Sequence, residues 1–507
     1  MKKKSTLVTI LTLILITFGA KFLGFLREVM IAQKFGTSSQ SDSFFIALTL
    51  TTLLGALIGQ SMNTVLIPLF SELKNQKGYK GKNRFTNNML TIIFIASILI
   101  VLISYLLSPI IVGTVAFGFE IDQYNLTLKL FKIGLLSILF TGIMSVFRAY
   151  LQSENKFNET ALSEMAINAS YLFFLFFYAD YYGIVGLMFA GVFGCFIQVF
   201  IQYLALRSTK FSYRYLVDFK DLYLKKVLFL SAPIFLTVIV SDINKSVDKA
   251  LASTLIEGSV SALSYGNRIN IMIFGVFITS ITTVFFTDLS KLAANKSYLS
   301  FKIKFQKAIN LILILTIPIT IILVLFSNQI VTLLLERGVF DSRASSLTAS
   351  ALIFYSLGLT GLSCRLLLIK TFFALQMTKT PMINSIIAVF FNIVFSLILI
   401  KTMQHEGLAL ASSLSITIMS LLMFYSLRKR LGNMNYKKII ITGTKVIVAS
   451  SIMGYVSGYC YESLIINNNM VISLMISLTI GFVTYLTTGT LLKIKEFNYL
   501  LKKIKIV

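Results

Sequence analysis

Apolar runs of about 20 residues, joined by short polar connections, make up most of the chain. An α-helix needs about 20 such residues to cross a hydrocarbon layer about 30 Å thick. The pattern therefore predicts about fourteen transmembrane helices. The expected spans are residues 6–26, 43–68, 87–113, 131–149, 161–180, 183–206, 227–250, 262–287, 306–327, 347–374, 382–402, 406–427, 438–460 and 470–492.

Helices fit these runs better than a β-barrel does, because barrel strands alternate apolar and polar residues and this chain does not. Hydrophobic residues occupy 56% of the 507 positions and charged residues 13%, whereas about a quarter of a soluble domain is charged. We expect an all-α polytopic membrane protein. The first apolar run resembles a signal peptide, but no small-residue cleavage site follows it, so we interpret it as the first helix.

The formal charge of +26 would suggest nucleic-acid binding in a soluble protein. Here most Lys and Arg residues precede the first span or follow an even-numbered span, which places them on one side of the membrane. The positive-inside rule makes that side cytoplasmic. We expect a multi-pass protein of the bacterial plasma (inner) membrane with both termini in the cytoplasm and no nucleic-acid partner. The cationic segments are residues 2–4, 74–84, 148–156, 207–226, 291–307, 379, 428–438 and 493–505.

A weak internal repeat divides the spans. Leu151-Gln152 recurs as Leu375-Gln376 and Asn168 as Asn392, all 224 residues apart, and the GLMFA that begins at Gly186 recurs as GLALA. Six spans lie between equivalent points, so the two halves would have the same orientation, as in transporters with parallel repeats. We expect a six-helix N-lobe (residues 1–226), a six-helix C-lobe (227–430), and a final helix pair with a basic cytoplasmic tail (431–507).

Several charged residues fall inside the spans, where each costs about 2.5–3.5 kcal/mol to insert and is by default a functional hypothesis. Those on spans one, two, seven and eight could face one another across the midline of the repeat. Guanidinium groups match phosphate oxygens bidentately, so a net cationic cavity suits a pyrophosphate headgroup. The alternative is that these side chains snorkel or form structural ion pairs. The expected headgroup-binding residues are Lys21, Arg27, Lys245, Arg268 and Arg365; the expected gating or ion-pairing residues are Glu28, Asp42, Asp242, Asp248 and Lys249.

Catalytic and metal-binding motifs are missing from the sequence. It contains no phosphate-binding loop of the type G-x-x-x-x-G-K-[ST] and no H-E-x-x-H or Cys–His cluster. The single histidine, His405, lies in a turn expected outside the membrane, where a solvated residue is the simplest interpretation. Cys195, Cys364 and Cys460 lie in apolar spans without metal or redox spacing. We expect a protein that is not an enzyme and has no resident cofactor or metal; a coupling ion stays open.

Four blocks of sequence are similar to the MurJ/MviN lipid II flippases of the multidrug/oligosaccharidyl-lipid/polysaccharide exporter superfamily. The first and most specific is LGFLREVMIAQKFGTSSQSDSFFIAL, from Leu23 to Leu48. The others are VDKALASTLIEGSVSALSYGNRI from Val247, LLLERGVFDSRASSLTASAL from Leu333, and ALQMTKTP, which ends at Pro381. The resemblance implies a V of two six-helix lobes around a cationic cavity, a final helix pair that forms a groove for the lipid tail, and alternating access.

The resemblance also implies residue roles. The family's essential arginine and acid of the first span correspond to Arg27 and Glu28, its second-span aspartate to Asp42, and its eighth-span arginine to Arg268. The chain departs from the pattern at four positions that are often charged in the family. These departures bear on which lipid-linked saccharide is carried; they are Lys21 in place of arginine, and Gly55, Ile271 and Met377 in place of charged residues.

Together these features predict a flippase that moves an undecaprenyl-pyrophosphate-linked saccharide, the peptidoglycan precursor lipid II first of all, from the cytoplasmic to the outer leaflet. Its partners would be that substrate, membrane lipids and proteins of cell-wall synthesis. The alternatives are a flippase for another lipid-linked polysaccharide unit and a cation-coupled drug exporter of the same superfamily. From a different class come a membrane glycosyltransferase and a non-transporting scaffold.

Overall fold

The computed structural model describes residues 6–377, 379–432, 434, 436–494 and 496–497. Helices account for nearly all of these residues, and no strand occurs within these ranges. The all-α prediction is confirmed. The cationic segment 2–4 and part of the expected basic tail, residues 495 and 498–507, lie outside the described residues.

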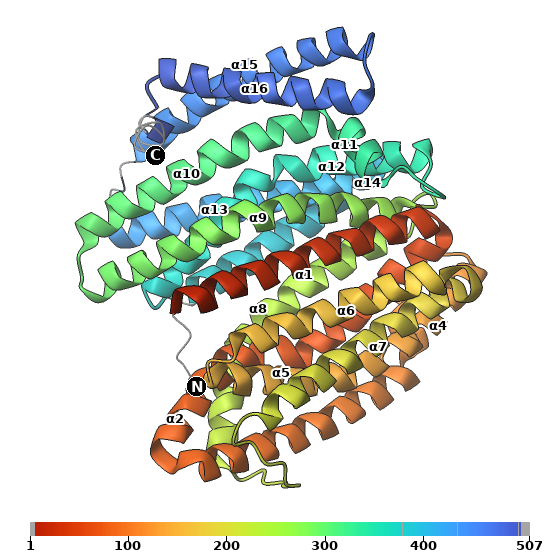
Figure 1. The fold of residues 1–507 in the computed structure, drawn as a ribbon, viewed down its shortest axis with the longest axis vertical. Coiled ribbons are helices and arrows are strands. Elements are labelled where there is room, and N and C mark those ends of the chain that lie inside the picture. The colour runs from red at the N-terminus through yellow and green to blue at the C-terminus, as the bar shows by residue number, and fades with distance from the viewer. Residues whose placement is uncertain (1–5, 378, 433, 435, 495, 498–507) are drawn as a thin grey trace. The chain divides into compact units, whose positions relative to one another are not determined.

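The first of two compact units comprises Met1–Ser261 and Arg337–Phe340. Within it α1 packs against α6, α6 against α7, and α2 against α5 and α8 (Figure 1). Its helices are α1 (Thr6–Phe35), α2 (Ser39–Leu106), α3 (Ser108–Gly113), α4 (Ile121–Gly134), α5 (Leu136–Ser153), α6 (Phe157–Phe177), α7 (Ala179–Arg207) and α8 (Leu222–Ala252).

The second unit comprises Ala262–Glu336 and Asp341–Val507. Helix α9 (Ser259–Ala294) begins at the end of the first unit and continues in the second. Within the second unit α10 packs against α13 and α15, and α15 pairs with α16. The remaining helices are α10 (Tyr298–Leu325), α11 (Ser327–Leu335), α12 (Ser342–Leu357), α13 (Leu359–Ala374), α14 (Lys379–Leu431), α15 (Tyr436–Ile465) and α16 (Met470–Leu491).

Two of the longest helices are broken by a single residue with positive φ. Gly78 (φ 63°) interrupts the 68-residue α2, and Gln404 (φ 49°) interrupts the 53-residue α14. Such backbone is uncommon in L-residues other than glycine and does not continue a right-handed helix. Each break therefore separates two apolar stretches that the sequence predicted as separate spans.

The structure supports the positions of the expected spans but not their number. Helices cover the expected ranges, but among the described residues nine helices are long and apolar enough to cross a membrane, or ten if α12 and α13 form one bent span. Helix α14 counts once in that number despite its break, and α1, α8 and α9 are not among the nine. The protein is thus polytopic, while the count of fourteen is not confirmed.

The unit boundary differs from the lobe boundary expected at residue 226. The first unit extends to Ser261 because α8 packs against α2. The unit boundary after Ser261 reflects which helices pack together, whereas the lobe boundary at residue 226 was inferred from the sequence repeat. The first therefore does not test the second. The division of the chain into N-lobe, C-lobe and final pair therefore stays a prediction.

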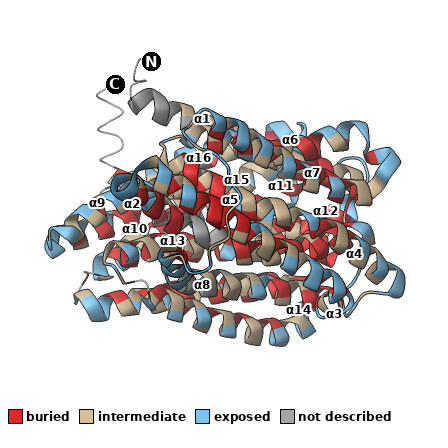
Figure 2. Cartoon of the chain, turned by 90° about the horizontal axis from the view of Figure 1, so that it is seen from below, coloured by how far each residue is buried: buried red, intermediate tan, exposed pale blue. Residues whose placement is uncertain are grey.

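Both units bury apolar clusters and expose apolar surface. In the second unit, one cluster joins Phe305 on α10, Leu367 on α13 and Met423 on α14. Large apolar side chains are also exposed, among them Phe229 at 81% and Tyr455 at 78%. The helices carry buried residues along one side and partly or fully exposed residues along the other (Figure 2). Exposed apolar surface on this scale fits a lipid solvent.

A second apolar cluster attaches the final helix pair to α10 of the same unit. Ile314 on α10 packs with Val446 on α15 and Tyr485 on α16. The hydroxyl of Tyr485 donates a hydrogen bond of 2.7 Å to the carbonyl of Ile314. The pair that the sequence separated from the repeat is thus packed onto the second unit.

Candidate functional site

Arg27 on α1 is the most fully enclosed of the predicted headgroup-binding residues in the first unit. Its side chain is 16% exposed. One terminal nitrogen, Nη1, donates a 3.0 Å hydrogen bond to Oδ1 of Asn168 on α6, and Nη2 is paired with the carboxylate of Glu28. The guanidinium carbon lies 5.2 Å from the ring centroid of Tyr171, also on α6. Arg27 and Glu28 thus form an ion pair, while their predicted roles in headgroup binding and gating stay predictions.

Asp42, near the start of α2, accepts hydrogen bonds from the backbone that enters α9. Its two oxygens accept from the N–H groups of Gly258 at 2.8 Å and Ser261 at 2.7 Å, and the residue is 2% exposed. Gly258 has φ +91°, and a Cβ there would lie 2.6 Å from the carbonyl of Thr37. Only glycine fits this turn. Asp42 therefore joins two helix starts that are far apart in sequence, while its gating role stays a prediction.

The predicted site residues on α8 make two separate sets of contacts. Lys245 Nζ is 2.6 Å from Asp242 Oδ1, a pair three residues apart on one helix face. Lys249 instead donates to the carbonyl of Val260 at 2.9 Å and lies 5.5 Å from the ring centroid of Phe45. Asp248 lies on the same helix and is half-buried. All four residues thus lie on one helix, and their functional roles stay predictions.

The other predicted cations are distributed over both units. Lys21 is exposed on α1, and Arg268 is exposed on α9 in the second unit. Arg365 on α13 is half-buried, and its Nη1 lies 3.9 Å from the sulfur of Met419. Its Nε has no hydrogen-bond partner among the described residues. A shared cationic cavity formed by residues of both units stays a prediction.

A polar cavity of about 460 Å³ lies beside Asp42 in the first unit, and no pattern in the sequence indicated it. Its wall includes residues from the start of α2, the α3–α4 connection, the start of α4 and the α8–α9 connection. Four of them are carboxylates: Asp42, Glu120, Asp122 and Glu257. Its lining is thus anionic, unlike the expected headgroup cavity. Among the described residues, no group of three or more His, Cys, Asp or Glu side chains could hold a metal ion.

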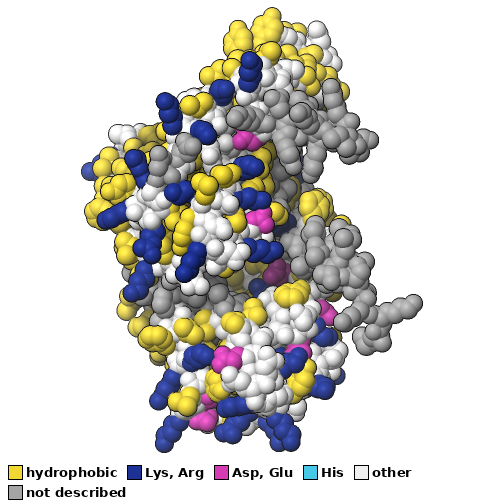
Figure 3. Space-filling view, turned by 90° about the vertical axis from the view of Figure 1, so that its left-hand side faces the viewer, with side chains coloured by type: hydrophobic (Ala, Val, Ile, Leu, Met, Phe, Trp, Pro, Cys, Tyr) yellow, Lys and Arg dark blue, Asp and Glu magenta, His cyan; other side chains and the backbone are white. Residues whose placement is uncertain are grey.

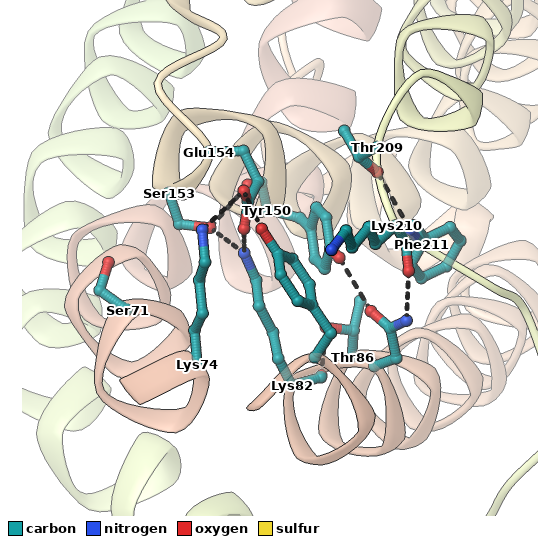
Figure 4. Close-up of polar contacts among 12 residues, drawn as sticks. Ser71, Lys74, Lys82, Thr86, Tyr150, Ser153, Glu154, Thr209, Lys210 and Phe211 are labelled. Carbon is teal, nitrogen blue, oxygen red and sulfur yellow. Dashed lines mark hydrogen bonds and ion pairs between the residues drawn. The ribbon is translucent and has the colours of Figure 1, made fainter. Parts of the chain in front are cut away.

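Sequence reasoning also missed a buried ion cluster on the side of the first unit predicted to be cytoplasmic (Figure 4). Lys82, fully buried on α2, donates to Ser153 at 2.7 Å and to Glu154 at 2.5 Å, and Lys74 lies 2.9 Å from Glu154. Burial alone would raise the pKa of Glu154, but the two lysines outweigh burial and hold that pKa below its usual value. The cationic segment 74–84, expected on the cytoplasmic side, is thus partly buried in the first unit.

The interpretation of His405 as a solvated turn residue is wrong. It is 5% exposed, and its Nε2 lies 3.0 Å from the hydroxyl of Ser350 and 3.2 Å from the carbonyl of Leu347. Helix α12 packs against α14 in the second unit, and its residues Leu347 and Ser350 contact the imidazole just after the break at Gln404. Only the tertiary contact could reveal this.

Comparison with known proteins identifies the family. The family model "Lipid II flippase MurJ" matches residues 31–480. The chain belongs to the MurJ lipid II flippase family. Among curated relatives it is 30% identical over 428 residues to the probable lipid II flippase MurJ of Buchnera aphidicola subsp. Schizaphis graminum, covering 83% of each chain. It is 26% identical over 500 residues to that of Rickettsia prowazekii, covering 95% of this chain and 97% of the relative.

Solved structures agree with the MurJ assignment. A lipid II flippase MurJ in an inward closed conformation has a TM-score of 0.79 and 25% identity, over 94% of this chain and 98% of that one. An inward-facing multidrug resistance transporter of the MATE family, in the MOP superfamily, has a TM-score of 0.70 at 14% identity, over 82% and 96%. The second likeness concerns the fold alone. The family predicted from the four sequence blocks is confirmed, and the chain is an integral membrane protein of a flippase family.

Proposed function

We propose that the chain translocates lipid II, with its undecaprenyl-pyrophosphate-linked saccharide, from the cytoplasmic to the outer leaflet of the plasma membrane. The observation that carries this proposal is the match to the lipid II flippase family along residues 31–480. The enclosed Arg27 supports it, because a guanidinium in a low-dielectric site is suited to phosphate oxygens. Both termini would lie in the cytoplasm, and proteins of cell-wall synthesis would be its neighbours.

In this proposal Arg27, Arg268 and Arg365 contact the pyrophosphate, together with Lys21 and Lys245. Glu28, Asp42, Asp242, Asp248 and Lys249 would pair with these cations or close the site. The sequence has no nucleotide-binding loop, so we propose that membrane potential or an ion gradient drives the transport, without a resident cofactor. No bond is made or broken in such a cycle, and we therefore propose that the chain is not an enzyme.

Depletion in the native cell would test the substrate. We expect lipid II to accumulate in the cytoplasmic leaflet when this protein is depleted, and to be cleared when the wild-type gene is restored. Arg27→Ala and Arg268→Ala should accumulate in the membrane at normal levels but fail to clear the precursor. Accumulation of a different lipid-linked saccharide would favour the alternative of a flippase for another polysaccharide unit.

A further inference from the structure

The side chain of Arg27 is held from α6, a helix to which the sequence assigned no site residue. Asn168 and Tyr171 are three residues apart and therefore lie on the same face of α6. Asn168 accepts from Arg27 Nη1 at 3.0 Å, and the Tyr171 ring, 5% exposed in total, lies 5.2 Å from the guanidinium carbon. One side chain fixes an end of the guanidinium group, and the other supports it through a cation–π contact.

The amide of Asn168 has only one useful orientation. Its Nδ2 donates to the carbonyl of Ala20 on α1 at 3.2 Å, so its Oδ1 faces Arg27. The residue predicted as its counterpart in the second repeat, Asn392, donates instead to the hydroxyls of Ser412 and Ser415. The first contact joins α6 to α1, and the second joins the two parts of α14 on either side of its break at Gln404. In the first half, the acceptor of that contact is used to orient a cation.

A third helix makes room for the ring. A Cβ on Gly191 of α7 would lie 2.1 Å from the Tyr171 hydroxyl and 2.7 Å from its Cζ. No real Cβ comes so close to another heavy atom, so any larger residue at 191 would displace the ring that lies against Arg27. Asn168 and Tyr171 therefore contact the guanidinium of Arg27 directly. Gly191 acts on it through the ring of Tyr171.

Part of the hydrogen-bonding capacity of the guanidinium group is not used by the described residues. Arg27 Nε is buried and has no hydrogen-bond partner among the described residues, while Nη1 and Nη2 are each engaged by a neighbour. An arginine side chain offers five N–H donors in a planar fork, so its orientation decides whether two of them can reach the same phosphate.

We propose that Asn168, Tyr171 and Gly191 are positioning residues that fix the plane of Arg27 for two-point contact with a pyrophosphate oxyanion. This inference rests on the proposed function, because it assumes that Arg27 contacts the headgroup. The three residues themselves act through Arg27 and need not touch the substrate. Their effect would be on affinity for the headgroup more than on the stability of the fold.

The test measures the concentration of lipid II that half-saturates transport by full-length protein in vesicles, for single variants and for the same variants combined with Arg27→Lys. Asn168→Ala and Tyr171→Leu should each raise that concentration about tenfold, the scale of a desolvated cation–π contact or a charged hydrogen bond. In the Arg27→Lys background both should have little further effect, because a rotating ammonium has no plane to orient. Phe173→Leu, an exposed aromatic on the same helix, is the matched control.

Conservative variants separate orientation from packing. Tyr171→Phe keeps the ring and should raise the half-saturating concentration less than Tyr171→Leu does. Gly191→Ala should raise that concentration while the melting temperature stays close to that of the wild type. Equal losses in the wild-type and Arg27→Lys backgrounds, or unchanged half-saturation in stable variants, would overturn the inference. Failure of the wild-type protein to transport any lipid pyrophosphate would instead contradict the proposed function.

Discussion

At the scale of single residues, the carboxylate of Asp42 stabilises the start of a distant helix. One carboxylate accepts two backbone N–H groups that begin a helix more than 200 residues later in the chain. Charged acceptors at helix N-termini are favoured by the helix dipole and by the unpaired N–H groups there. An amide cannot replace it, because Asn would present a donor to one of these N–H groups.

Asp42→Asn should therefore lower the free energy of unfolding by about 1–3 kcal/mol, the cost of a buried donor without an acceptor, and should abolish transport. The melting temperature of the purified protein and complementation of depleted cells would measure the two effects. Asp122→Asn, an exposed acid on the same cavity, is the control. A wild-type melting temperature for Asp42→Asn would contradict the hydrogen-bonding described above.

Glu154 predicts a dependence of stability on pH. Because its pKa in the folded protein lies below its usual value, its contribution is fully present above the unfolded pKa of about 4.3 and is lost as pH falls through the folded pKa. Wild-type stability should thus fall below about pH 4 more steeply than that of Glu154→Gln, which already lacks the pair.

At neutral pH, Glu154→Gln should be the less stable protein, since it leaves Lys82 buried without a carboxylate. Thermal unfolding at neutral and at acidic pH would measure both differences. Glu159→Gln, whose side chain is 41% exposed and 3.7 Å from Lys156, should change little at either pH. Parallel acid profiles for the wild type and Glu154→Gln would exclude the proposed linkage.

At the scale of elements, a row of asparagines on α2 fixes the connection between α7 and α8. Asn83 donates to the carbonyl of Lys210 at 2.6 Å and Asn87 to that of Ser212 at 2.9 Å. Asn88 donates to the carbonyl of Asp218 at 2.8 Å and accepts from its N–H at 2.7 Å. The irregular backbone of this connection is thereby hydrogen-bonded without a sheet.

Asn88→Ala should loosen this connection locally, because it removes two hydrogen bonds to one backbone residue. Amide hydrogen exchange at residues 210–218 should increase about tenfold or more, while exchange in α6 and α7 stays unchanged. Asn125→Ala, at an exposed position on α4, should have no such effect. Unchanged exchange at residues 210–218 would count against the asparagine row as the fixing element.

The elements were largely predictable because their cause is local. Apolar runs of about 20 residues have few alternatives to a helix in lipid, so the positions of most spans followed from hydrophobicity. The pairing of Arg27 with Glu28, adjacent in sequence, was also within reach. Contacts that join distant segments could not be predicted, because no local pattern in the sequence relates the two residues. The examples are Asp42 with Ser261, Lys82 with Glu154, and His405 with Ser350.

At the scale of the whole molecule, the charge distribution predicts how the chain lies in the membrane. Lys and Arg side chains greatly outnumber Asp and Glu on the face shown in Figure 3, in keeping with the excess of 46 over 20 in the sequence. The positive-inside rule places the segments after even-numbered spans in the cytoplasm. A position just after α14 and one in the α15–α16 turn should thus lie on opposite sides.

Reporter fusions after Leu431 and after Asn467 would measure this topology. We expect a cytoplasm-specific reporter to be active at the first position, and a reporter that requires export to be active at the second. A fusion at the N-terminus should behave like the one after Leu431. The reverse pattern at all three positions would contradict the orientation, and opposite results for the N-terminal and Leu431 fusions would contradict an even number of spans between them.

Transport of lipid II by the purified protein tests the central claim most directly. Vesicles containing full-length protein and fluorescent lipid II, with an imposed membrane potential, would be treated with a membrane-impermeant quencher to measure how much label has crossed between the leaflets. We predict that wild-type protein raises the fraction of labelled lipid II that crosses between the leaflets well above that of empty vesicles. The Arg27→Ala variant should not raise that fraction, although its melting temperature is normal. No crossing with wild-type protein under any imposed gradient, or equal crossing with Arg27→Ala, would contradict the account.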